Sequence, residues 1–220
     1  TTRFEMCEIK LHVRVPMDCW RQWVRDRTGN VNEYSRRYSI AIDAASRTQP
    51  DQWRRQAAEN KQGSAGFVDR SVGAQLSARE EGQNIEARRV YQDRLEAGVA
   101  REQARKDLPL STYTEAYWKI DLHNFFHVVN LRAEKHAQQE IQDFANAMYD
   151  LVKPKFPLCC EAFEDYSENA VTFSKQEMDV VRELLEYADT KAALAGMSIE
   201  GGSLEQRLSK REKKEFLEKI

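Results

Sequence analysis

The segment that most constrains the fold is residues 25–38, RDRTGNVNEYSRRY, which places four arginines around one large aliphatic side chain, Val31. Guanidinium groups are almost never buried without partners, so this segment must lie at a surface or line a polar site. Thr28, Gly29 and Asn30 predict a turn between the end of a helix and an extended arm. If that arm folds back, several guanidinium groups can face one anion, and their planar forks suit phosphate.

Composition leaves three interpretations of this charge open: an exposed loop paired with acidic neighbours, a phosphate site, or a nucleic-acid-binding patch. The whole chain has a net charge of −2, so general attraction to nucleic acid is not indicated. Residues 1–70 carry 13 Lys/Arg against 9 Asp/Glu, whereas residues 71–220 carry 21 against 27. The local excess favours an anion site over a polyanion-binding surface.

The hydrophobic patterns predict few strands and many helices. Residues 7–15 alternate apolar and polar side chains, which predicts a strand with one buried face that ends at Pro16. Asp18 is a candidate cap for a short helix in which Trp20, Trp23 and Val24 share one face. The later elements are a surface loop at 41–67, helices at 69–96 and after Gly98, a strand at 111–120, helices at 123–132 and 141–152, and helices begun by capping boxes at Ser174–Glu177 and Ser203–Gln206.

This pattern is typical of an α+β protein that is mostly helical with a small antiparallel sheet. The sequence has no internal repeat and no linker, which predicts a single domain over residues 1–220. No apolar run approaches the ~20 residues of a membrane span, so no membrane partner is expected. The four cysteines, which form no CxxC pair, indicate free thiols in a reducing cytosol: Cys7, Cys19, Cys159 and Cys160.

The order of residues in the arginine segment resembles a known signature. RxRxxxxNEYSxRY is similar to RHRxxSxNExSxR of the flavin-dependent thymidylate synthases. FEMCEIKLHVRVPMDCWRQW resembles the strand and helix before that signature, and NKQGS resembles a loop of longer members. Further along, LPLSTYTEAYWKIDLHNFFHVVNLRAEKHAQQEIQ is similar to the second ligand-binding region of the family, and EAFEDYSENAVTFSKQEM to a common tail. The resemblance therefore extends over most of residues 2–180 and implies the fold of that family.

The resemblance implies a chemistry and partners. Members of the family methylate C5 of a uracil nucleotide without a cysteine nucleophile. Methylenetetrahydrofolate gives the carbon, reduced FAD gives a hydride, and NADPH reduces the flavin. The family also implies a cytoplasmic homotetramer whose active sites draw on several subunits, with small-molecule rather than nucleic-acid partners.

The resemblance also implies roles for individual residues. Arg132 and Ser35 are the expected catalytic residues, Arg132 by favouring the charge that develops on the uracil ring. The expected nucleotide contacts are Gln22, Arg25, Glu33, Tyr34, Ser35, Arg36, Arg37, Arg105 and Arg132. The expected flavin contacts are Thr2, Arg25, Asp26, Arg27, Glu33, Asp121, Leu122, His123 and His127.

Other interpretations of these residues stay open. Arg132 could instead cap the end of its helix. His123 and His127, four residues apart, could bind a metal, but no third ligand with suitable spacing is visible, so flavin contact or packing is favoured and no metal is predicted. Ser35 could be a nucleophile, but it has no evident neighbouring base, which favours a polarising hydrogen-bond donor.

The sequence departs from the family pattern at several positions. Asp26 stands in place of histidine, Asn30 in place of serine, and Arg36 in place of a small residue. Arg3 and Met6 also differ, and the first ~50 residues of the family are not in this chain. The changes indicate a specialised paralogue, such as the UMP methylases of nucleoside-antibiotic pathways of the polyoxin type. A non-catalytic flavin- or nucleotide-binding paralogue and an RNA-binding regulator are the alternatives.

Overall fold

The computed structural model describes residues 2–26, 28–35, 44–58 and 63–187, together with residues 198–199, 202–203, 209, 212 and 216. The chain divides into two compact units, residues 1–168 and residues 169–220. Whether residues 1–220 form a single domain stays a prediction.

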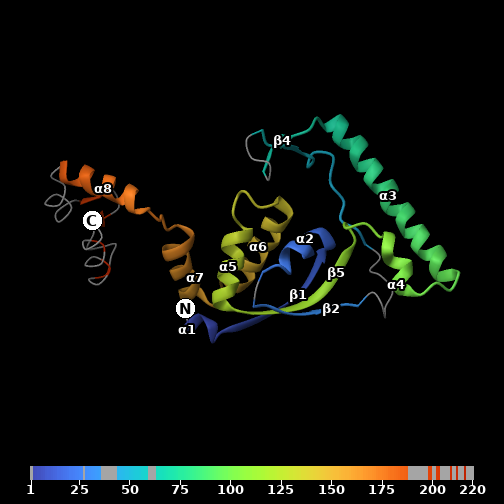
Figure 1. Cartoon of the computed structure of the whole chain (residues 1–220), viewed down its shortest axis with the longest axis horizontal. Helices are drawn as coiled ribbons and strands as arrows, with labels where there is room; N and C mark the ends of the chain where they lie inside the picture. Colours follow the sequence, from blue (N-terminus) through green and yellow to red (C-terminus); the bar gives the residue numbers. More distant parts are fainter. Residues whose placement is uncertain are drawn as a thin grey trace. The chain divides into compact units, whose positions relative to one another are not determined.

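A three-stranded antiparallel sheet in the order β1-β5-β2 organises the first unit (Figure 1). Strands β1 (Glu8–Pro16) and β5 (Tyr113–Asp121) pair along their whole length, and β2 (Asn30–Glu33) pairs with the other edge of β5. The strand predicted at 7–15 from alternation and the strand predicted at 111–120 are both confirmed. Because successive side chains point to opposite faces, the alternation leaves one face of the sheet apolar.

Helices cover that apolar face and complete the core. They are α2 (Met17–Trp23), α5 (Leu122–Arg132), α6 (Gln139–Val152) and α7 (Pro157–Phe163), with α1 (Thr2–Glu5) packed on α5. Aromatic side chains dominate the core: Trp23 lies edge-on to Trp118 with ring centroids 5.2 Å apart, and both are fully buried. Such pairs stabilise a fold through large apolar area and through their geometry. The helices predicted at 123–132 and 141–152 are confirmed, and α7 ends in the turn η2 (Glu164–Glu168).

Two details predicted for the first helix are wrong. The helix begins at Met17 directly after Pro16, so Asp18 lies in its first turn and does not cap it. Backbone carbonyl oxygens of another segment already satisfy the first turn: the Met17 N–H donates to Thr112 and the Asp18 N–H to Leu110, each at 3.1 Å, so no side-chain cap is needed. Val24 lies beyond the end of the helix and is 45% exposed, so only Trp20 and Trp23 share the buried face.

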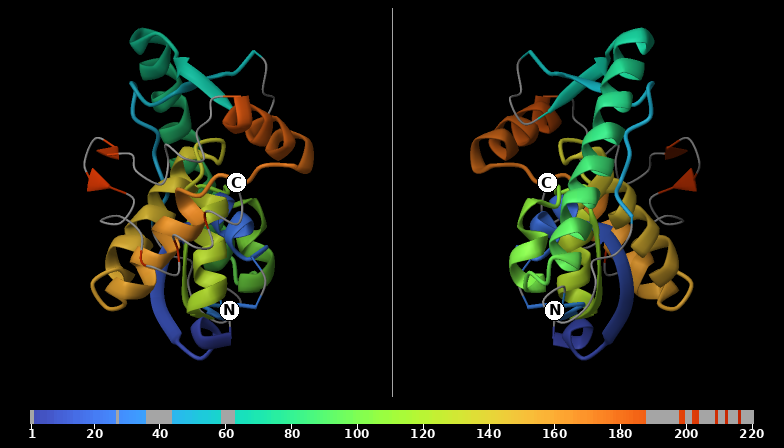
Figure 2. Two further views of the ribbon diagram at one scale, coloured as in Figure 1. Left: turned by 90° about the vertical axis from the view of Figure 1, so that its left-hand side faces the viewer. Right: turned by 90° about the vertical axis from the view of Figure 1, so that its right-hand side faces the viewer.

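The long helix α3 (Arg70–Glu96) confirms the helix predicted at 69–96 and is uninterrupted in all views (Figure 2). Only three of its residues are buried, among them Gly73 and Ser77. The segment at 48–53 packs there: the Trp53 indole Nε1 donates to Ser77 Oγ at 3.0 Å, and Ser77 Oγ donates to the Thr48 carbonyl oxygen at 2.7 Å. The helix predicted after Gly98 is confirmed: α4 (Arg101–Ala104) and the 3₁₀ turn η1 (Arg105–Asp107) follow Gly98 and end before Pro109.

The irregular loop predicted at 41–67 contains a hairpin, so that prediction is wrong for its two strands. They are β3 (Arg54–Gln56) and β4 (Ser64–Phe67), which pair antiparallel. Both strands are short and mostly exposed, and neither alternates apolar with polar residues, which explains why the pattern gave no signal. Residues 36–43 and 59–62 lie outside the described residues.

The second unit contains α8 (Lys175–Tyr187), which begins with the predicted capping box. The Ser174 N–H donates to Glu177 Oε2 at 2.8 Å, and the Glu177 N–H donates to Ser174 Oγ at 3.3 Å. The second predicted box is wrong, because Ser203 lies in strand β7 (Gly202–Ser203), which pairs with β6 (Ser198–Ile199). The same reciprocal hydrogen bonds occur instead between Ser209 and Glu212. Within the described residues, no helix has the length and apolar character needed to cross a membrane.

Candidate functional site

Arg132, the last residue of α5, contacts the chain just after α2. Its Nε donates to Asp26 Oδ2 at 3.2 Å and its Nη2 to Asp26 Oδ1 at 3.1 Å, so one edge of the guanidinium lies along the carboxylate. Nη2 also donates to the Gln22 carbonyl oxygen at 2.8 Å. The alternative that Arg132 caps its own helix is therefore wrong, since its hydrogen bonds go to another element.

The Asp26–Arg132 pair is well shielded from water. The Asp26 side chain is 7% exposed and the Arg132 side chain 18%. Burial raises the pKa of the Asp26 carboxyl above its ordinary value, and the hydrogen bond and charge of Arg132 oppose this without overcoming it. The ionised carboxylate is thus held in a place that disfavours its charge.

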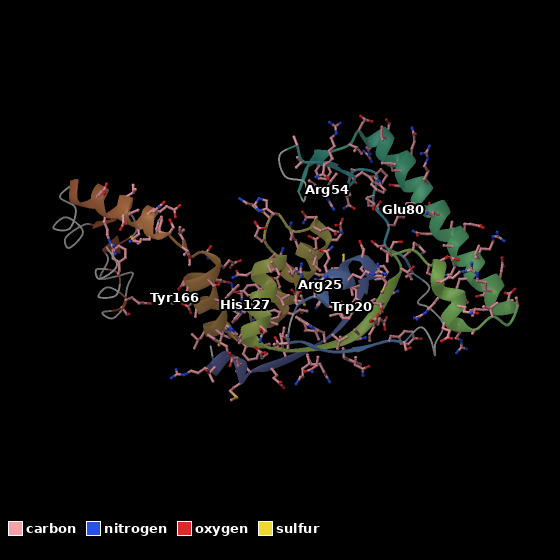
Figure 3. The ribbon with its side chains drawn as sticks, in the orientation of Figure 1. Trp20, Arg25, Arg54, Glu80, His127 and Tyr166 are labelled. Carbon is pink, nitrogen blue, oxygen red and sulfur yellow. The ribbon has the colours of Figure 1, made fainter. Side chains whose placement is uncertain are left out.

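Gln22 links Arg132 to the start of α6. Its side-chain Nε2 donates to Gln138 Oε1 at 2.6 Å, while its carbonyl oxygen accepts from Arg132 and from the Arg25 N–H at 3.3 Å. We call Gln22, Asp26, Arg132 and Gln138 the Arg132 cluster. Arg25 is exposed in the turn beside it, near Trp20 (Figure 3). The structure therefore brings together four of the predicted site residues, Gln22, Arg25, Asp26 and Arg132. Arg132 lies 106 positions after Asp26 in the sequence.

The turn within the arginine segment is held against the core. A Cβ on Gly29 would lie 2.4 Å from Trp118 Nε1, which is a steric clash, so only glycine fits here without a shift of the ring. The preceding residue, Thr28, has a φ of 65°, which is unusual for a β-branched side chain. The backbone shape between Asp26 and β2 is thus set by close packing on Trp118.

Glu33 ends β2 with both carboxylate oxygens engaged. Oε2 accepts from Trp20 Nε1 at 3.0 Å and Oε1 accepts from Thr114 Oγ1 at 2.7 Å. The Tyr34 N–H donates to the Glu115 carbonyl oxygen at 2.8 Å, which continues the sheet toward half-buried Ser35. Arg27, Arg36 and Arg37 lie outside the described residues, so their expected roles stay predictions.

A second group of predicted residues lies at the start of α5. Asp121 caps this helix by accepting from the Asn124 N–H at 2.9 Å; burial raises its pKa, but the hydrogen bonds from Asn124 lower the pKa overall. His123 and His127 lie on successive turns, with ring centroids 4.7 Å apart and edges in contact. Leu122 is fully buried and its N–H donates to the Cys7 carbonyl oxygen, so it belongs to the core.

A cavity of about 350 Å³ adjoins these histidines. Its wall is largely aromatic, and Figure 3 shows His127 and Tyr166 in this region. Phe4 and Phe126 also line it and pack edge-on at 6.0 Å, which places α1, and with it Thr2, at this end of α5. Aromatic walls with two imidazoles suit a planar ring system.

Arg105, an expected nucleotide contact, lies apart from the Arg132 cluster in this chain. It begins η1, which packs on α3 and α4. No hydrogen bond joins it to the Arg132 cluster within the described residues of this chain. Its expected nucleotide contact therefore stays a prediction.

A larger cavity, about 750 Å³, was not predicted from the sequence. The β3–β4 hairpin lines it together with residues 135–142, among them Gln138 of the Arg132 cluster; Figure 3 labels Arg54 and Glu80 on its wall. Arg54 Nη2 donates to both carboxylate oxygens of Glu140, at 2.7 and 2.8 Å. No sequence signal connects two residues so far apart in the chain, and only the fold shows that Gln138, the hydrogen-bond partner of Gln22, lines this cavity.

Comparison with known proteins identifies the family. The family model described as "Thymidylate synthase complementing protein" matches residues 1–158, and the chain belongs to this family. Flavin-dependent thymidylate synthases from Wolbachia pipientis wMel and Dictyostelium discoideum are 43% and 40% identical to it, over 84% and 83% of the chain. The chain spans 65% and 60% of the length of these two relatives. An enzyme of that name from Thermus thermophilus is 42% identical over 96% of the chain and 76% of its own length.

Solved structures agree with this assignment. The chain resembles PolB from Streptomyces cacaoi, described as a UMP/dUMP methylase, in crystal structures bound with 5-Br dUMP and with 5-Br UMP. The TM-scores are 0.65 and 0.67, at 27% and 30% identity, covering 72% and 73% of this chain and 71% and 75% of PolB. The predicted family and the predicted α+β class, mostly helical with a small antiparallel sheet, are confirmed.

Proposed function

We propose that the chain forms the active site of an enzyme that methylates C5 of a uracil nucleotide in a flavin-dependent reaction. The observation that carries the proposal is the Arg132 cluster: a guanidinium held by Asp26 and the Gln22 carbonyl oxygen, and linked through Gln22 to Gln138 in the wall of a polar cavity, in a chain of this family. The names of the relatives support flavin dependence, and the PolB structures support a uracil nucleotide as substrate.

Arg132 is the proposed catalytic residue. Asp26 and Gln22 occupy Nε and Nη2, so in the described part of the chain Nη1 is the nitrogen without a hydrogen-bond partner. Its two N–H groups can donate to an oxygen or a ring nitrogen of uracil. A fixed cation acts most strongly where negative charge appears in the transition state, which is the expected event when the ring is activated at C5. Ser35 is the proposed polarising hydrogen-bond donor.

The residues around His123 and His127 fit a flavin ring. The aromatic wall can stack on a planar system, and imidazole nitrogens can donate to its polar edge. The cavity of about 350 Å³ is small for a whole dinucleotide, so further contacts would come from Thr2, Arg25, Arg27 and another subunit. When bound, FAD would supply the hydride and methylenetetrahydrofolate the carbon, with NADPH as the reductant of the flavin. Arg105, apart from the cluster in one chain, fits a homotetramer with shared sites.

Flavin binding and turnover test the proposal together. We expect the purified protein to bind FAD non-covalently, with flavin absorbance that co-elutes on gel filtration. With dUMP and methylenetetrahydrofolate present, reduced flavin should be oxidised as a methylated nucleotide forms. Excess FAD that gives neither a spectral shift nor retention would remove the flavin mechanism. Binding of FAD and dUMP without flavin oxidation would instead identify a non-catalytic paralogue.

We further propose that UMP and dUMP are both substrates, with comparable rates. The structural relative PolB is named for both nucleotides, and Arg36, expected along the sugar and phosphate, offers a donor for a 2′-hydroxyl. An unpartnered buried hydroxyl would cost ~1–3 kcal/mol, which such a donor would offset. The measurement is kcat/KM for both nucleotides in wild type and Arg36→Gly. A preference for dUMP above ~10³-fold, more than about 4 kcal/mol, would exclude the ribonucleotide.

A further inference from the structure

We propose that Asp26 is a positioning residue for Arg132, fixing the guanidinium side-on so that its Nη1 end is presented to the pyrimidine of the bound nucleotide. The proposal rests on the proposed function, because it assigns the pyrimidine to Arg132. It goes beyond that function in giving Asp26 the task of orienting the catalytic cation, in place of a flavin contact.

The geometry supports orientation rather than simple charge pairing. A carboxylate that accepts from both Nε and Nη2 fixes the plane of the guanidinium as well as its position. The Gln22 carbonyl oxygen accepts a third hydrogen bond from Nη2. Arginine without such bonds would sample several rotamers, and ordering it would then have to occur on nucleotide binding.

The chemistry at position 26 also matters. The resembling signature has histidine there, and a neutral imidazole has one acceptor nitrogen, whereas a carboxylate accepts two parallel hydrogen bonds. The Asp26 side chain is 7% exposed, so nothing but the protein and a bound ligand can satisfy it. Burial raises the pKa of Asp26 despite the hydrogen bond and charge of the neighbouring arginine.

Two effects of removing Asp26 oppose each other. Loss of its negative charge would help a phosphorylated ligand, but water screens that repulsion at the distance of a nucleotide phosphate, and it is worth about twofold. Loss of the fixed guanidinium means that a long side chain must be ordered on binding, which weakens affinity by up to about tenfold. The second effect is larger, so the affinity for nucleotide should fall.

The test is a double-mutant cycle on the FAD-loaded protein, with the dissociation constant of dUMP measured by titration calorimetry. We expect Asp26→Ala to weaken dUMP binding by up to about fivefold, or ~1 kcal/mol, and Asp26→Asn, which keeps one acceptor, to weaken it less. In an Arg132→Lys background, where no fork remains to be oriented, Asp26→Ala should change the affinity less than about twofold. Glu81→Gln, which breaks the exposed Arg47–Glu81 pair, is the matched control and should leave the affinity unchanged.

Equal losses in both backgrounds would overturn the proposal, because a merely structural role does not depend on the fork of Arg132. Unchanged affinity in a folded Asp26→Ala protein would overturn it too. If the alanine variant does not fold, Asp26→Asn in the same cycle gives the answer. Turnover measured in parallel separates this inference from the proposed function. If the Asp26 and Arg132 substitutions are coupled in dUMP binding but no methylated nucleotide forms, the inference stands and the proposed function is removed. If the nucleotide is methylated but the losses in affinity are additive, the proposed function stands and the inference is overturned. A wild type that binds neither dUMP nor UMP overturns this inference.

Discussion

The Asp26–Arg132 pair and the Glu86–Arg89 pair on α3 use the same hydrogen bonds in different surroundings. In each pair the arginine Nε and Nη2 donate to the two oxygens of one carboxylate. The Arg89 and Glu86 side chains are 62% and 58% exposed, whereas those of Arg132 and Asp26 are 18% and 7% exposed. The hydrogen bond from Arg89 lowers the pKa of Glu86, while burial raises the pKa of Asp26.

This contrast teaches what each pair is for. On α3, water solvates both charges, so the hydrogen bond from Arg89 lowers the pKa of the Glu86 carboxyl. In the Arg132 cluster, loss of water costs more than the arginine returns. A buried pair whose carboxyl has a raised pKa, linked through Gln22 and Gln138 to a cavity of about 750 Å³, is a candidate functional site.

The largest expected effect is on turnover. Arg132→Lys keeps the charge but loses the planar fork, so it cannot hold Asp26 and donate to uracil in the same way. Loss of a transition-state contact of ~3 kcal/mol would slow methylation by ~10²-fold in single-turnover experiments. Arg89→Lys, the same change in the exposed pair, should leave the rate unchanged. Wild-type turnover in a folded Arg132→Lys protein would remove the functional difference between the two pairs.

The two regions should also respond oppositely to a single methyl group. Gly29→Ala would place its Cβ 2.4 Å from Trp118 Nε1, and that ring is fixed by Trp23 and fully buried. Such overpacking costs ~1–3 kcal/mol, and each kcal/mol lowers Tm by ~2–4 °C in a chain of this size.

Gly82→Ala on α3 is the matched change, since nothing lies within 4 Å of its added Cβ. Alanine is the better helix former, so this variant should gain up to ~1 kcal/mol. Thermal unfolding of both variants followed by circular dichroism is the measurement. A Gly29→Ala protein as stable as wild type would show that the turn is not held by Trp118.

The same contrast explains what the sequence could predict. The strand at 7–15 follows from alternation, because one of its faces is buried, and the strand at 111–120 follows from its aromatic and threonine content. The helix at 69–96 follows from its many good helix formers, since only three residues of α3 are buried. The hairpin at 54–67 lacks alternation, so it could not be predicted. The expected cap at Asp18 was wrong because the first N–H groups of α2 donate to the Leu110 and Thr112 carbonyl oxygens, a long-range contact that the sequence does not show.

At the site, the resemblance identified Gln22, Asp26 and Arg132 one by one but not their contacts. Asp26 was expected near flavin, and its partnership with Arg132 depends on a contact between residues 106 positions apart. Gln138 and the cavity that it lines gave no signal for the same reason. Long-range contacts of this kind arise from the antiparallel pairing of β1 with β5, which brings the ends of α2 and α5 together.

The smallest and most discriminating effect is the pH dependence of stability in Asp26→Asn and Glu86→Gln. Because the folded-state pKa of Asp26 is raised, its favourable contribution is complete below the ordinary aspartate pKa and is lost as pH rises through the folded value. Asp26→Asn should therefore unfold a few degrees above wild type at neutral pH, with the difference in Tm closing in mild acid.

The folded-state pKa of Glu86 is lowered, so its favourable contribution is present above the ordinary glutamate pKa and is lost as pH falls. Glu86→Gln should therefore unfold below wild type at neutral pH. Arg132 retains some exposure, so the asparagine variant does not leave a fully buried lone charge. If calorimetry at neutral pH instead shows Asp26→Asn to be less stable than wild type, attraction to Arg132 outweighs burial, and the pair has a structural role like that of an ordinary buried salt bridge.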